Sequence, residues 1–361
     1  METDPDARMP PRPDDLVAMP AKDEDPRREA AAAWAGAVLG AEGPVVLEPA
    51  SADASFRRYF RLTTPAPART LIVMDAPPAH EDCGPFVAVA ALLEAAGIRA
   101  PRVIAQSEQG YLLLTDLGRD TLLDVLAGAG PDREERLYRD AIATLVRMQA
   151  IDARGLAPYD RALLSRELAL FPDWYLDRHL GQPLAERDRA SLEAVFVRIV
   201  DGSLAQPRVF VHRDYHSRNL MASPEGLGVL DFQDAVLGPV TYDLVSLLRD
   251  AYVDAEESVV IDRAIRYWEA AREAGIALPD DFGTFYRDFE WMGVQRHLKV
   301  MGIFARLAHR DGKHRYLADI PRVRRYLIAA CSRYAELSPL LRWLDVEPVA
   351  GGLSFHRSVA S

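Results

Sequence analysis

The sequence predicts an α+β fold with two lobes, a small β-rich lobe with one helix followed by a larger, mainly α-helical lobe. Three observations lead to this prediction. The chain has 361 residues, which is about twice the length of a common domain. Between residues 45 and 115, short apolar runs are separated by turn residues, a pattern typical of strands. From residue 121 onward, apolar residues recur at helical spacing.

The small lobe is expected to contain residues 29–117 and to follow a tail, residues 1–28, that we predict to be disordered. The tail is rich in proline and charge, and it cannot bury enough apolar surface to order itself. One helix over 29–39 is predicted before the strands, and one over 86–96 among them. The predicted strands are 45–47, 55–62, 70–75, 103–106 and 111–115.

The large lobe is expected to span residues 118–361 and to consist mainly of helices. Its apolar residues recur every three to four positions, which is the period of a helix with one buried face. The predicted helices are 121–128, 132–151, 161–180, 185–201, 241–253, 257–275, 280–309 and 319–336. Two short apolar runs, 209–212 and 228–230, are predicted to be strands with a polar segment between them.

The composition argues against several classes of protein. With 43 Lys+Arg against 54 Asp+Glu, the formal net charge is -11, so we expect no nucleic-acid partner and no anionic membrane surface. The two cysteines, Cys83 and Cys331, lie far apart and near no histidine cluster, so we predict neither a disulfide framework nor a zinc site. Residues 1–28 lack the apolar segment of a signal peptide, and no apolar run is long enough to cross a bilayer of about 30 Å. We expect a cytoplasmic monomer.

The residues that indicate chemistry lie around the two predicted strands of the large lobe. The segment reads His212-Arg213-Asp214, followed after four residues by Asn219 and twelve residues later by Asp231. Phosphoryl transfer needs a carboxylate that orients and deprotonates the attacking hydroxyl. It also needs an amide and a second carboxylate that hold Mg²⁺ against the nucleotide phosphates. Each residue alone is commonly a turn or capping residue, but together at this spacing Asp214, Asn219 and Asp231 predict a kinase-like catalytic site.

Four further segments accompany this loop: residues 238–244 behind it, and the motifs Asp53-Ala54-Ser55-Phe56-Arg57-Arg58-Tyr59, Met74-Asp75-Ala76-Pro77-Pro78 and Gln295-Arg296-His297-Leu298-Lys299. With them, the chain resembles the aminoglycoside phosphotransferase family of protein-kinase-like small-molecule kinases over about residues 30–340. Within that family, the three flanking motifs look like those of the anomeric N-acetylmuramate/N-acetylglucosamine kinases of cell-wall (peptidoglycan) recycling.

The resemblance implies a protein-kinase-like bilobal fold. Residues 29–117 would form a nucleotide-binding N-lobe and hinge, and residues 118–361 a helical C-lobe with the catalytic loop and the sugar site. ATP and Mg²⁺ would be the cofactors, with Asn219 and Asp231 as metal ligands. Asp214 would be the base and would contact the sugar hydroxyl.

The resemblance also assigns supporting residues. Asp243 would brace the catalytic loop, and His212 would be a packed, hydrogen-bonded organiser of that loop and not an acid or base. The hinge, where backbone groups meet adenine, is expected at Thr115, Asp116 and Leu117.

One departure from the family's pattern concerns a lysine. Kinases of this fold use a lysine on the third strand, paired with a helix glutamate, to hold the nucleotide phosphates. The chain contains three lysines, Lys22, Lys299 and Lys313. None lies in the predicted third strand, so we expect an arginine to take its place, Arg58 first and Arg57 or Arg61 as alternatives. Otherwise magnesium and the backbone would carry more of the binding.

A second departure is the loop that would cover the phosphates, residues 50–55, which contains no glycine. We expect the hydroxyl groups of Ser51 and Ser55, with backbone N–H groups, to bind the phosphates there. Glu94, in the position of the helix glutamate, would lose its usual counter-ion.

The acceptor side is expected on the helix around residues 291–306. An apolar stripe is formed there by Trp291, Val294, Leu298, Met301 and Ala305. Gln295, Lys299 and Arg306 lie on a neighbouring face, and they form either a solvated flank or a cleft wall for the substrate. Such a wall would bind the sugar and the lactyl carboxylate of N-acetylmuramate, for which arginine suits bidentate recognition. A polycationic aminoglycoside would require carboxylates there instead.

The sequence-based hypothesis is therefore an ATP-dependent kinase that converts an amino sugar into its 1-phosphate. One alternative is another small-molecule kinase of the same fold, acting on an aminoglycoside or a choline-like alcohol. Another is a catalytically inactive nucleotide-binding regulator, as the missing lysine and the glycine-free loop suggest. A protein kinase is disfavoured, because no DFG or APE element follows Asp231.

Overall fold

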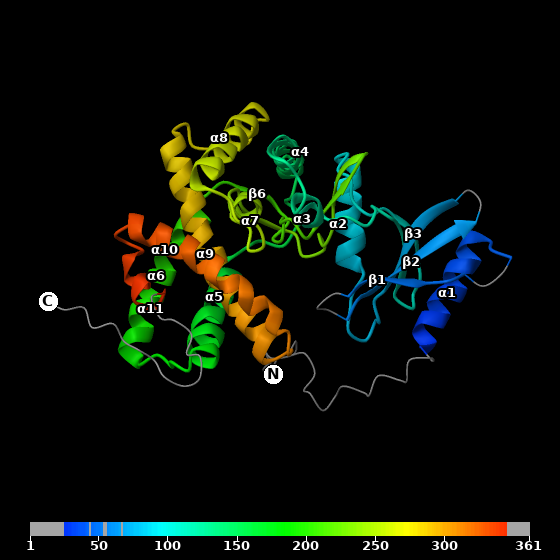
Figure 1. The fold of residues 1–361 in the computed structure, drawn as a ribbon, viewed down its shortest axis with the longest axis horizontal. Coiled ribbons are helices and arrows are strands. Elements are labelled where there is room, and N and C mark those ends of the chain that lie inside the picture. The colour runs from blue at the N-terminus through cyan, green and yellow to red at the C-terminus, as the bar shows by residue number, and fades with distance from the viewer. Residues whose placement is uncertain (1–24, 43–44, 53–55, 66–67, 345–361) are drawn as a thin grey trace. The chain divides into compact units, whose positions relative to one another are not determined.

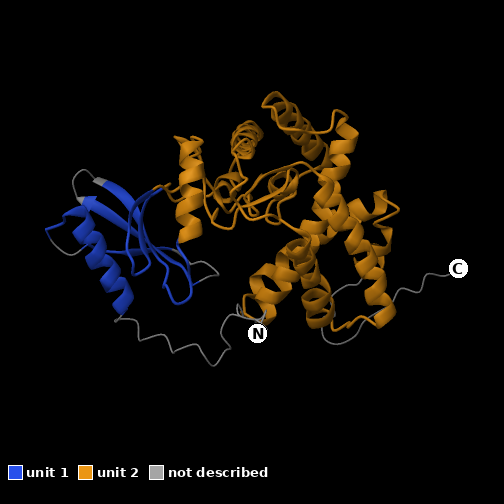
Figure 2. Ribbon diagram, turned by 180° about the vertical axis from the view of Figure 1, so that it is seen from behind, with its two compact units in different colours: residues 1–83, 103–116 blue, residues 84–102, 117–361 orange. Residues whose placement is uncertain are grey.

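The computed structural model describes residues 25–42, 45–52, 56–65 and 68–344, so residues 1–24 of the predicted tail lie outside it. The chain divides into two compact units, shown in Figure 2: residues 1–83 and 103–116 form unit 1, and residues 84–102 and 117–361 form unit 2. The predicted α+β class, with a β-rich part followed by a mainly helical part, is confirmed.

Unit 1 contains a five-stranded antiparallel sheet with the strand order β1-β2-β3-β5-β4. Its strands are β1 (Glu48–Ala52), β2 (Arg58–Pro65), β3 (Ala68–Asp75), β4 (Val103–Gln106) and β5 (Tyr111–Thr115). Strands β4 and β5 have the bounds that the sequence predicts. Strands β2 and β3 pair along their full length, from Arg58 opposite Asp75 to Pro65 opposite Ala68.

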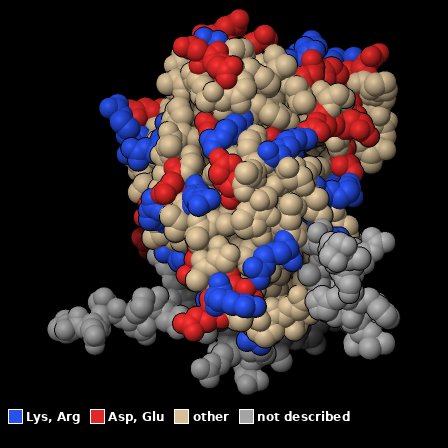
Figure 3. Space-filling view, turned by 90° about the vertical axis from the view of Figure 1, so that its left-hand side faces the viewer, with Lys and Arg blue, Asp and Glu red and all other residues tan. Residues whose placement is uncertain are grey.

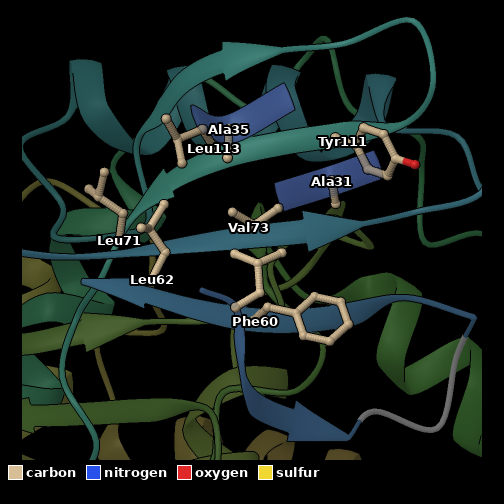
Figure 4. Packing of buried hydrophobic residues seen from close by; sticks show 9 residues of the cluster. Ala31, Ala35, Phe60, Leu62, Leu71, Val73, Tyr111 and Leu113 are labelled. Atoms are coloured by element: carbon tan, nitrogen blue, oxygen red, sulfur yellow. The ribbon is translucent and has the colours of Figure 1, made fainter. Parts of the chain in front are cut away.

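Helix α1 (Pro26–Leu39) packs on one face of this sheet, and Figure 4 shows the core between them. Alternate residues of a strand point to the same face, so every second side chain of β2, β3 and β5 points to the helix. This core is formed by Ala31, Ala35, Leu47, Phe60, Leu62, Leu71, Val73, Tyr111 and Leu113.

Helix α1 begins three residues before the predicted start at residue 29. The Asp25 side chain caps it by accepting a hydrogen bond from the Arg28 backbone N–H (3.1 Å), and Pro26 occupies the first turn, where no N–H is needed. Gly40, at φ 64°, ends the helix in the left-handed conformation that glycine adopts easily. The proline and charges that suggest a tail therefore include the start signal of this helix.

Strand β1 lies at 48–52 and not at the predicted 45–47. The side chain of Leu47 is buried in the core, while its carbonyl oxygen accepts a hydrogen bond from Arg28 Nε (3.1 Å). That oxygen is therefore bound to a side chain and not to a neighbouring strand, and the ladder starts one residue later. The first half of the expected phosphate-covering loop, residues 50–52, is consequently part of a strand.

Unit 2 is built mainly of helices, and Figure 1 labels its α-helices. They are α2 (Gly84–Ala95), α3 (Leu122–Leu126), α4 (Pro131–Gln149), α5 (Arg161–Leu170), η2 (Phe171–His179), α6 (Glu186–Ala205), α7 (Tyr242–Leu248), α8 (Glu257–Glu273), α9 (Phe282–His309), η3 (His314–Asp319), α10 (Ile320–Arg333), η4 (Ser338–Leu340) and α11 (Leu341–Leu344). Helix α9 has 28 residues and contacts α5, α6, α7, α10, η2 and η3, so it is the central helix of this unit.

Two short antiparallel strand pairs lie among these helices and frame the catalytic segment. Strand β6 (Arg208–Val211) pairs with β9 (Val236–Pro239), and β7 (Leu220–Ser223) pairs with β8 (Gly226–Val229). Strands β6 and β8 correspond to the two strands predicted from the sequence, at 209–212 and 228–230, whereas β7 and β9 are not predicted. Strands of four residues that contain serine, glycine or proline carry little strand signal of their own.

The segment predicted as one helix, 161–180, contains two kinds of helix. Helix α5 continues as η2, a π-helix of nine residues. Helix α9 passes so close to this junction that a Cβ added at Gly302 would lie 2.4 Å from the carbonyl oxygen of Leu170. Glycine at 302 therefore permits the close packing of α9 against α5 and η2.

On the face shown in Figure 3, acidic and basic side chains are interspersed. No helix in the described part of the chain is long and apolar enough to cross a membrane.

Candidate active site

The three predicted catalytic residues converge in unit 2. Strand β6 leads into the loop that carries Asp214 and Asn219, and the β7–β8 hairpin brings the chain back to Asp231. Asn219 Nδ2 donates to the Asp214 carbonyl oxygen (3.0 Å) and lies 3.4 Å from Asp231 Oδ2. The Leu230 backbone N–H donates to the Asn219 carbonyl oxygen (2.8 Å), which fixes the register of the two segments.

Asp243 braces the catalytic loop, as the resemblance implies. Its two carboxylate oxygens accept hydrogen bonds from the backbone N–H groups of His212 (2.6 Å) and Arg213 (3.0 Å). Burial raises the pKa of Asp243 to about 6, although the two N–H groups and the nearby His212 favour the ionised form. The carboxylate thus satisfies backbone donors that no helix or sheet satisfies.

His212 is a packed organiser, which also agrees with the sequence analysis. Its ring is fully buried, its Nε2 donates to the Leu230 carbonyl oxygen (2.8 Å), and its Nδ1 accepts from the Asp214 backbone N–H (3.3 Å). Burial lowers the pKa of His212, so the ring is neutral at pH 7 and has the Nε2-protonated form. It joins the segment that carries Asp214 to the segment that carries Asp231.

Two residues of this segment have backbone conformations that side chains disfavour. Arg213 has φ 81° and Asp231 has φ 61°. Such strain persists only where surrounding contacts hold it, and it is concentrated at functional sites. Here the contacts of Asp243 and Asn219 hold both segments in place.

The Asp214 carboxylate is half-exposed, with 46% of its side chain accessible, and basic groups surround it. The nearest is Arg296 of α9, whose Nη2 lies 3.8 Å from Asp214 Oδ1. Desolvation alone would raise the pKa of Asp214, but the positive charges of Lys299 and Arg296 hold it well below its usual range. Asp214 is therefore ionised throughout the physiological pH range.

Gln295 and Lys299, predicted on the substrate wall, lie in a buried cluster around Glu167 of α5. Glu167 accepts hydrogen bonds from Lys299 Nζ (2.9 Å), Arg213 Nη2 (2.7 Å), Gln295 Nε2 (3.2 Å) and the Tyr159 hydroxyl. Burial would raise the pKa of Glu167, but Lys299 and Arg213 lower it, so the carboxylate stays ionised. These side chains connect α9 to the catalytic loop through Arg213.

Arg306, the third residue of the predicted wall, is half-buried on α9 and lies ten residues after Arg296. At 1.5 Å per residue this separation is about 15 Å along the helix. Burial and the neighbouring Arg310 lower the pKa of Arg306. The structure therefore brings Asp214 next to Arg296 and puts Arg306 at a different level of the helix.

Further residues near Asp214 are absent from the sequence-based site. Arg218 stacks on the ring of Tyr252 at 3.7 Å, and the ring of His216 contacts the same tyrosine edge-on at 5.3 Å. His216 Nδ1, like Nε and Nη1 of Arg296, is buried and has no hydrogen-bond partner within the described part of the chain. Arg296 is part of the 295–299 motif, so the sequence marks this segment as functional. The sequence of one helix does not show that Arg296 lies beside Asp214, because that contact depends on how the helix packs on the loop.

Asn219 and Asp231 fit the magnesium expected from the sequence. Both are oxygen donors, and Mg²⁺ is commonly bound by one or two protein groups together with substrate phosphates and water. Asn219 donates both of its hydrogen bonds through the amide nitrogen, which directs the amide oxygen away from them. Gln233 Nε2 donates to Asp231 Oδ1 (2.7 Å) and so orients the carboxylate. Among the described residues, no group of three or more His, Cys, Asp and Glu side chains forms a metal site.

The arginines of unit 1 differ in their partners. Arg58, the first choice for the missing lysine, lies between two carboxylates: it donates to Asp75 Oδ2 through Nε (3.0 Å) and to Asp25 Oδ1 through Nη2 (3.2 Å). Asp25 is the cap of α1, so Arg58 is on the helix-covered face of the sheet. Arg61 binds both oxygens of Asp116 (2.6 and 3.1 Å), which fixes the side chain of this predicted hinge residue.

Arg57 makes an ion pair of a different kind. Its Nε donates to Glu81 Oε2 (3.1 Å), and both side chains are 13% exposed. The other oxygen of Glu81 accepts from the Phe56 backbone N–H (3.3 Å), so one carboxylate holds both the arginine and the backbone that leads into β2. The predicted partner Glu94 is more than half exposed and lies 3.7 Å from Arg102.

The remaining predicted nucleotide contacts are placed only in part. Ser55 lies outside the described residues, and of Ser51 only the backbone is described, within β1. Thr115 is the last residue of β5. Leu117 packs on Gly228 of β8, where an added Cβ would lie 2.7 Å from the leucine Cδ1.

Comparisons with known proteins agree on the family. A profile described as "Phosphotransferase enzyme family" matches residues 46–278. An N-acetylmuramate/N-acetylglucosamine kinase of Pseudomonas aeruginosa is 54% identical over 82% of this chain and 87% of that protein. A protein of the same description from Neisseria meningitidis is 47% identical over 81% of this chain and 87% of that protein.

A choline kinase structure from Cryptosporidium parvum has the same fold at 10% identity. It aligns with a TM-score of 0.57 over 83% of this chain and 93% of that chain. The predicted kinase-like fold is thereby confirmed.

Proposed function

The chain belongs to the phosphotransferase enzyme family, and from this premise we propose that it transfers the γ-phosphoryl group of ATP to the anomeric hydroxyl of N-acetylmuramate and N-acetylglucosamine. Membership of a kinase family implies ATP as the donor. The observation that carries the proposal is the convergence of Asp214, Asn219 and Asp231 on one braced loop. The relatives' names supply the acceptor class.

In the proposed reaction, Asp214 accepts a hydrogen bond from the C1 hydroxyl and then takes its proton. A bond forms between the C1 oxygen and the γ-phosphorus, and the bond from that phosphorus to the β–γ bridging oxygen breaks, which releases ADP. A carboxylate with a lowered pKa is a weak base, so its main contribution is to orient the hydroxyl, and the proton moves as the oxygen–phosphorus bond forms. An anomeric hydroxyl is more acidic than an ordinary alcohol, which suits such a base.

Asn219 and Asp231 would hold Mg²⁺, which supplies charge stabilisation for the transferring phosphoryl group. The chain's own contribution is to orient these two ligands through the loop bonds of Asn219 and the Gln233 amide. We propose the backbone of 115–117 as the adenine contact.

For the nucleotide phosphates we propose Arg57 ahead of Arg58. Arg57 and Glu81 form a largely buried arginine–carboxylate pair next to the expected phosphate loop, comparable to the lysine–glutamate pair of related kinases. Arg58 would have to leave two carboxylates to bind a phosphate. Ser51 and Ser55 remain predicted phosphate contacts.

On the acceptor side, we propose that Gln295 and Lys299 do not contact the sugar but position the catalytic loop. They bind Glu167, which in turn binds Arg213 of the loop. Arg306 remains a predicted sugar contact. Cytoplasmic location and a monomeric state also remain predictions.

An ADP-release assay with a panel of acceptors tests the proposal. Purified protein with ATP and Mg²⁺ is expected to turn over with N-acetylmuramate and N-acetylglucosamine, and not with choline or a polycationic aminoglycoside. Activity only with a cationic amine would assign the chain to another acceptor class. Absence of turnover with every acceptor would favour an inactive nucleotide-binding regulator.

A further inference from the structure

Arg296 is exceptional among the buried arginines of unit 2. Its side chain is 3% exposed, yet the described part of the chain offers it no hydrogen-bonded carboxylate; Asp214 is at 3.8 Å. Nε and Nη1 are buried without a hydrogen-bond partner within that part. The comparable buried arginines Arg213 and Arg263 each have a carboxylate, at 2.7 and 2.8 Å.

An unsatisfied buried guanidinium is costly. Hydrogen bonds to charged groups contribute more to stability than hydrogen bonds between neutral groups. A buried donor without a partner has lost its hydrogen bonds to water and gains no protein hydrogen bond in exchange. A fold that keeps such a group beside its catalytic base therefore calls for an explanation other than stability. A role in holding the loop does not suffice, because Glu167 and Asp243 already brace Arg213 and its neighbours.

The surroundings of Arg296 suit an acidic, partly apolar ligand. His216, two residues after Asp214, also has a buried ring nitrogen, Nδ1, without a partner within the described residues. The Tyr252 ring lies beside it and carries the Arg218 guanidinium. Arg296 and His216, each with a nitrogen that has no partner in the described part of the chain, thus lie near the Asp214 carboxylate, and an aromatic ring lies beside His216.

We propose that Arg296 binds the lactyl carboxylate of N-acetylmuramate and so sets the preference for this sugar over the neutral N-acetylglucosamine. The inference rests on the proposed function and deepens it by naming a specificity residue. The planar fork of arginine matches a carboxylate with two parallel hydrogen bonds. The lactyl group branches from the sugar ring two carbons from C1, so a group adjacent to Asp214 is within its reach when the C1 hydroxyl is on Asp214.

The test compares kcat/KM for the two sugars in the wild type, Arg296→Gln and Arg296→Lys. Arg296→Gln is expected to lower kcat/KM for N-acetylmuramate about 10- to 100-fold more than for N-acetylglucosamine, the loss of one charged hydrogen-bonded contact. Arg296→Lys keeps the charge without the fork and is expected to be intermediate. The matched control is Arg287→Gln, the same substitution on the surface of the same helix, which leaves the ratio of the two sugars unchanged.

A substrate-side change keeps the test valid if a variant folds poorly. The methyl ester of N-acetylmuramate lacks the negative charge, so the wild type should use it no better than N-acetylglucosamine. In Arg296→Gln the esterification should then have little further effect, because it removes the same interaction. Equal use of the acid and its ester by the wild type would overturn the inference.

Other outcomes separate the inference from its premise. A wild type that phosphorylates neither sugar refutes the proposed function itself. The wild type could use both sugars while Arg296→Gln is impaired equally for both and has a raised KM for ATP. That result would show that Arg296 contacts the transferring phosphoryl group and not the sugar carboxylate. A changed ratio in Arg306→Gln but not in Arg296→Gln would assign the carboxylate to Arg306.

Discussion

The catalytic loop of unit 2 and the strand edge of unit 1 keep the kinase pattern to different degrees. In the loop, the residue types and their spacing are those of a phosphotransferase, and buried partners, Asp243 and His212, brace its backbone. At the strand edge, the start of β2 that carries Arg57 and Arg58, both arginines are bound to carboxylates, and the sequence lacks the lysine expected on the third strand and the glycines expected in residues 50–55. The difference suggests that the groups in contact with the reacting atoms are constrained in type, whereas phosphate binding tolerates a different residue in a different position.

The largest effect is expected from the loop. Asp214→Asn should lower kcat about 10²- to 10⁴-fold, because the amide can neither take the hydroxyl proton nor orient it in the same way. ATP binding and the melting temperature should stay close to those of the wild type. Steady-state kinetics alongside thermal melting provide this check, and a variant with near-normal turnover would rule out Asp214 as the base.

A smaller but clear effect is expected at the metal ligands. Asp231→Asn should lower activity and raise the Mg²⁺ concentration for half-maximal rate by about 10-fold or more, because one charged oxygen ligand is replaced by a neutral one. A Mg²⁺ titration of both proteins measures this. Chelation of the metal should abolish turnover in the wild type, and an unchanged Mg²⁺ dependence in the variant would exclude Asp231 as a ligand.

The strand edge provides the sharpest comparison of two neighbouring residues. Arg57→Ala is expected to raise KM for ATP about 10-fold, the loss of one charged hydrogen bond. Arg58→Ala should change KM for ATP less and lower the melting temperature more, because the fully buried Asp75 loses one of its two arginine partners. If the two variants exchange these effects, Arg58 is the phosphate-binding residue.

The smallest effect concerns stability in acid. Lys299 and Arg213 lower the pKa of Glu167 below its unfolded value, so its contribution to the unfolding free energy is present above about pH 4.5 and is lost as the pH falls through the lowered pKa. Glu167→Gln should be less stable near neutral pH, and its melting temperature should fall less than that of the wild type between pH 5 and pH 3. Parallel melting curves for the two proteins would indicate that Glu167 does not carry this charge-dependent stability.

The sequence predicts the loop well because its information is local. Asp214, Asn219 and Asp231 lie within eighteen residues, and short strands on both sides keep them together. The same holds for β4 and β5, which a four-residue turn joins.

What the sequence leaves open depends on tertiary packing. Consecutive helical residues point about 100° apart, so Arg296 lies at the side of the polar face that contains Gln295 and Lys299, and the helical pattern alone does not show which of these residues meets the catalytic loop. Only the packing of α9 on the catalytic loop shows that Arg296 is the residue beside Asp214. The choice between Arg57 and Arg58 likewise depends on Asp25 and Glu81, which are distant in sequence. Glu167, 46 residues before Arg213, carries no sequence signal for its role.

Phosphorus NMR of the product tests the central claim most directly. After incubation of the protein with ATP, Mg²⁺ and N-acetylmuramate or N-acetylglucosamine, we predict a sugar phosphate signal coupled to the anomeric proton, and its absence with Asp214→Asn. A phosphate coupled to the C6 protons, or no sugar phosphate at all while ATP is consumed, would contradict an anomeric sugar kinase.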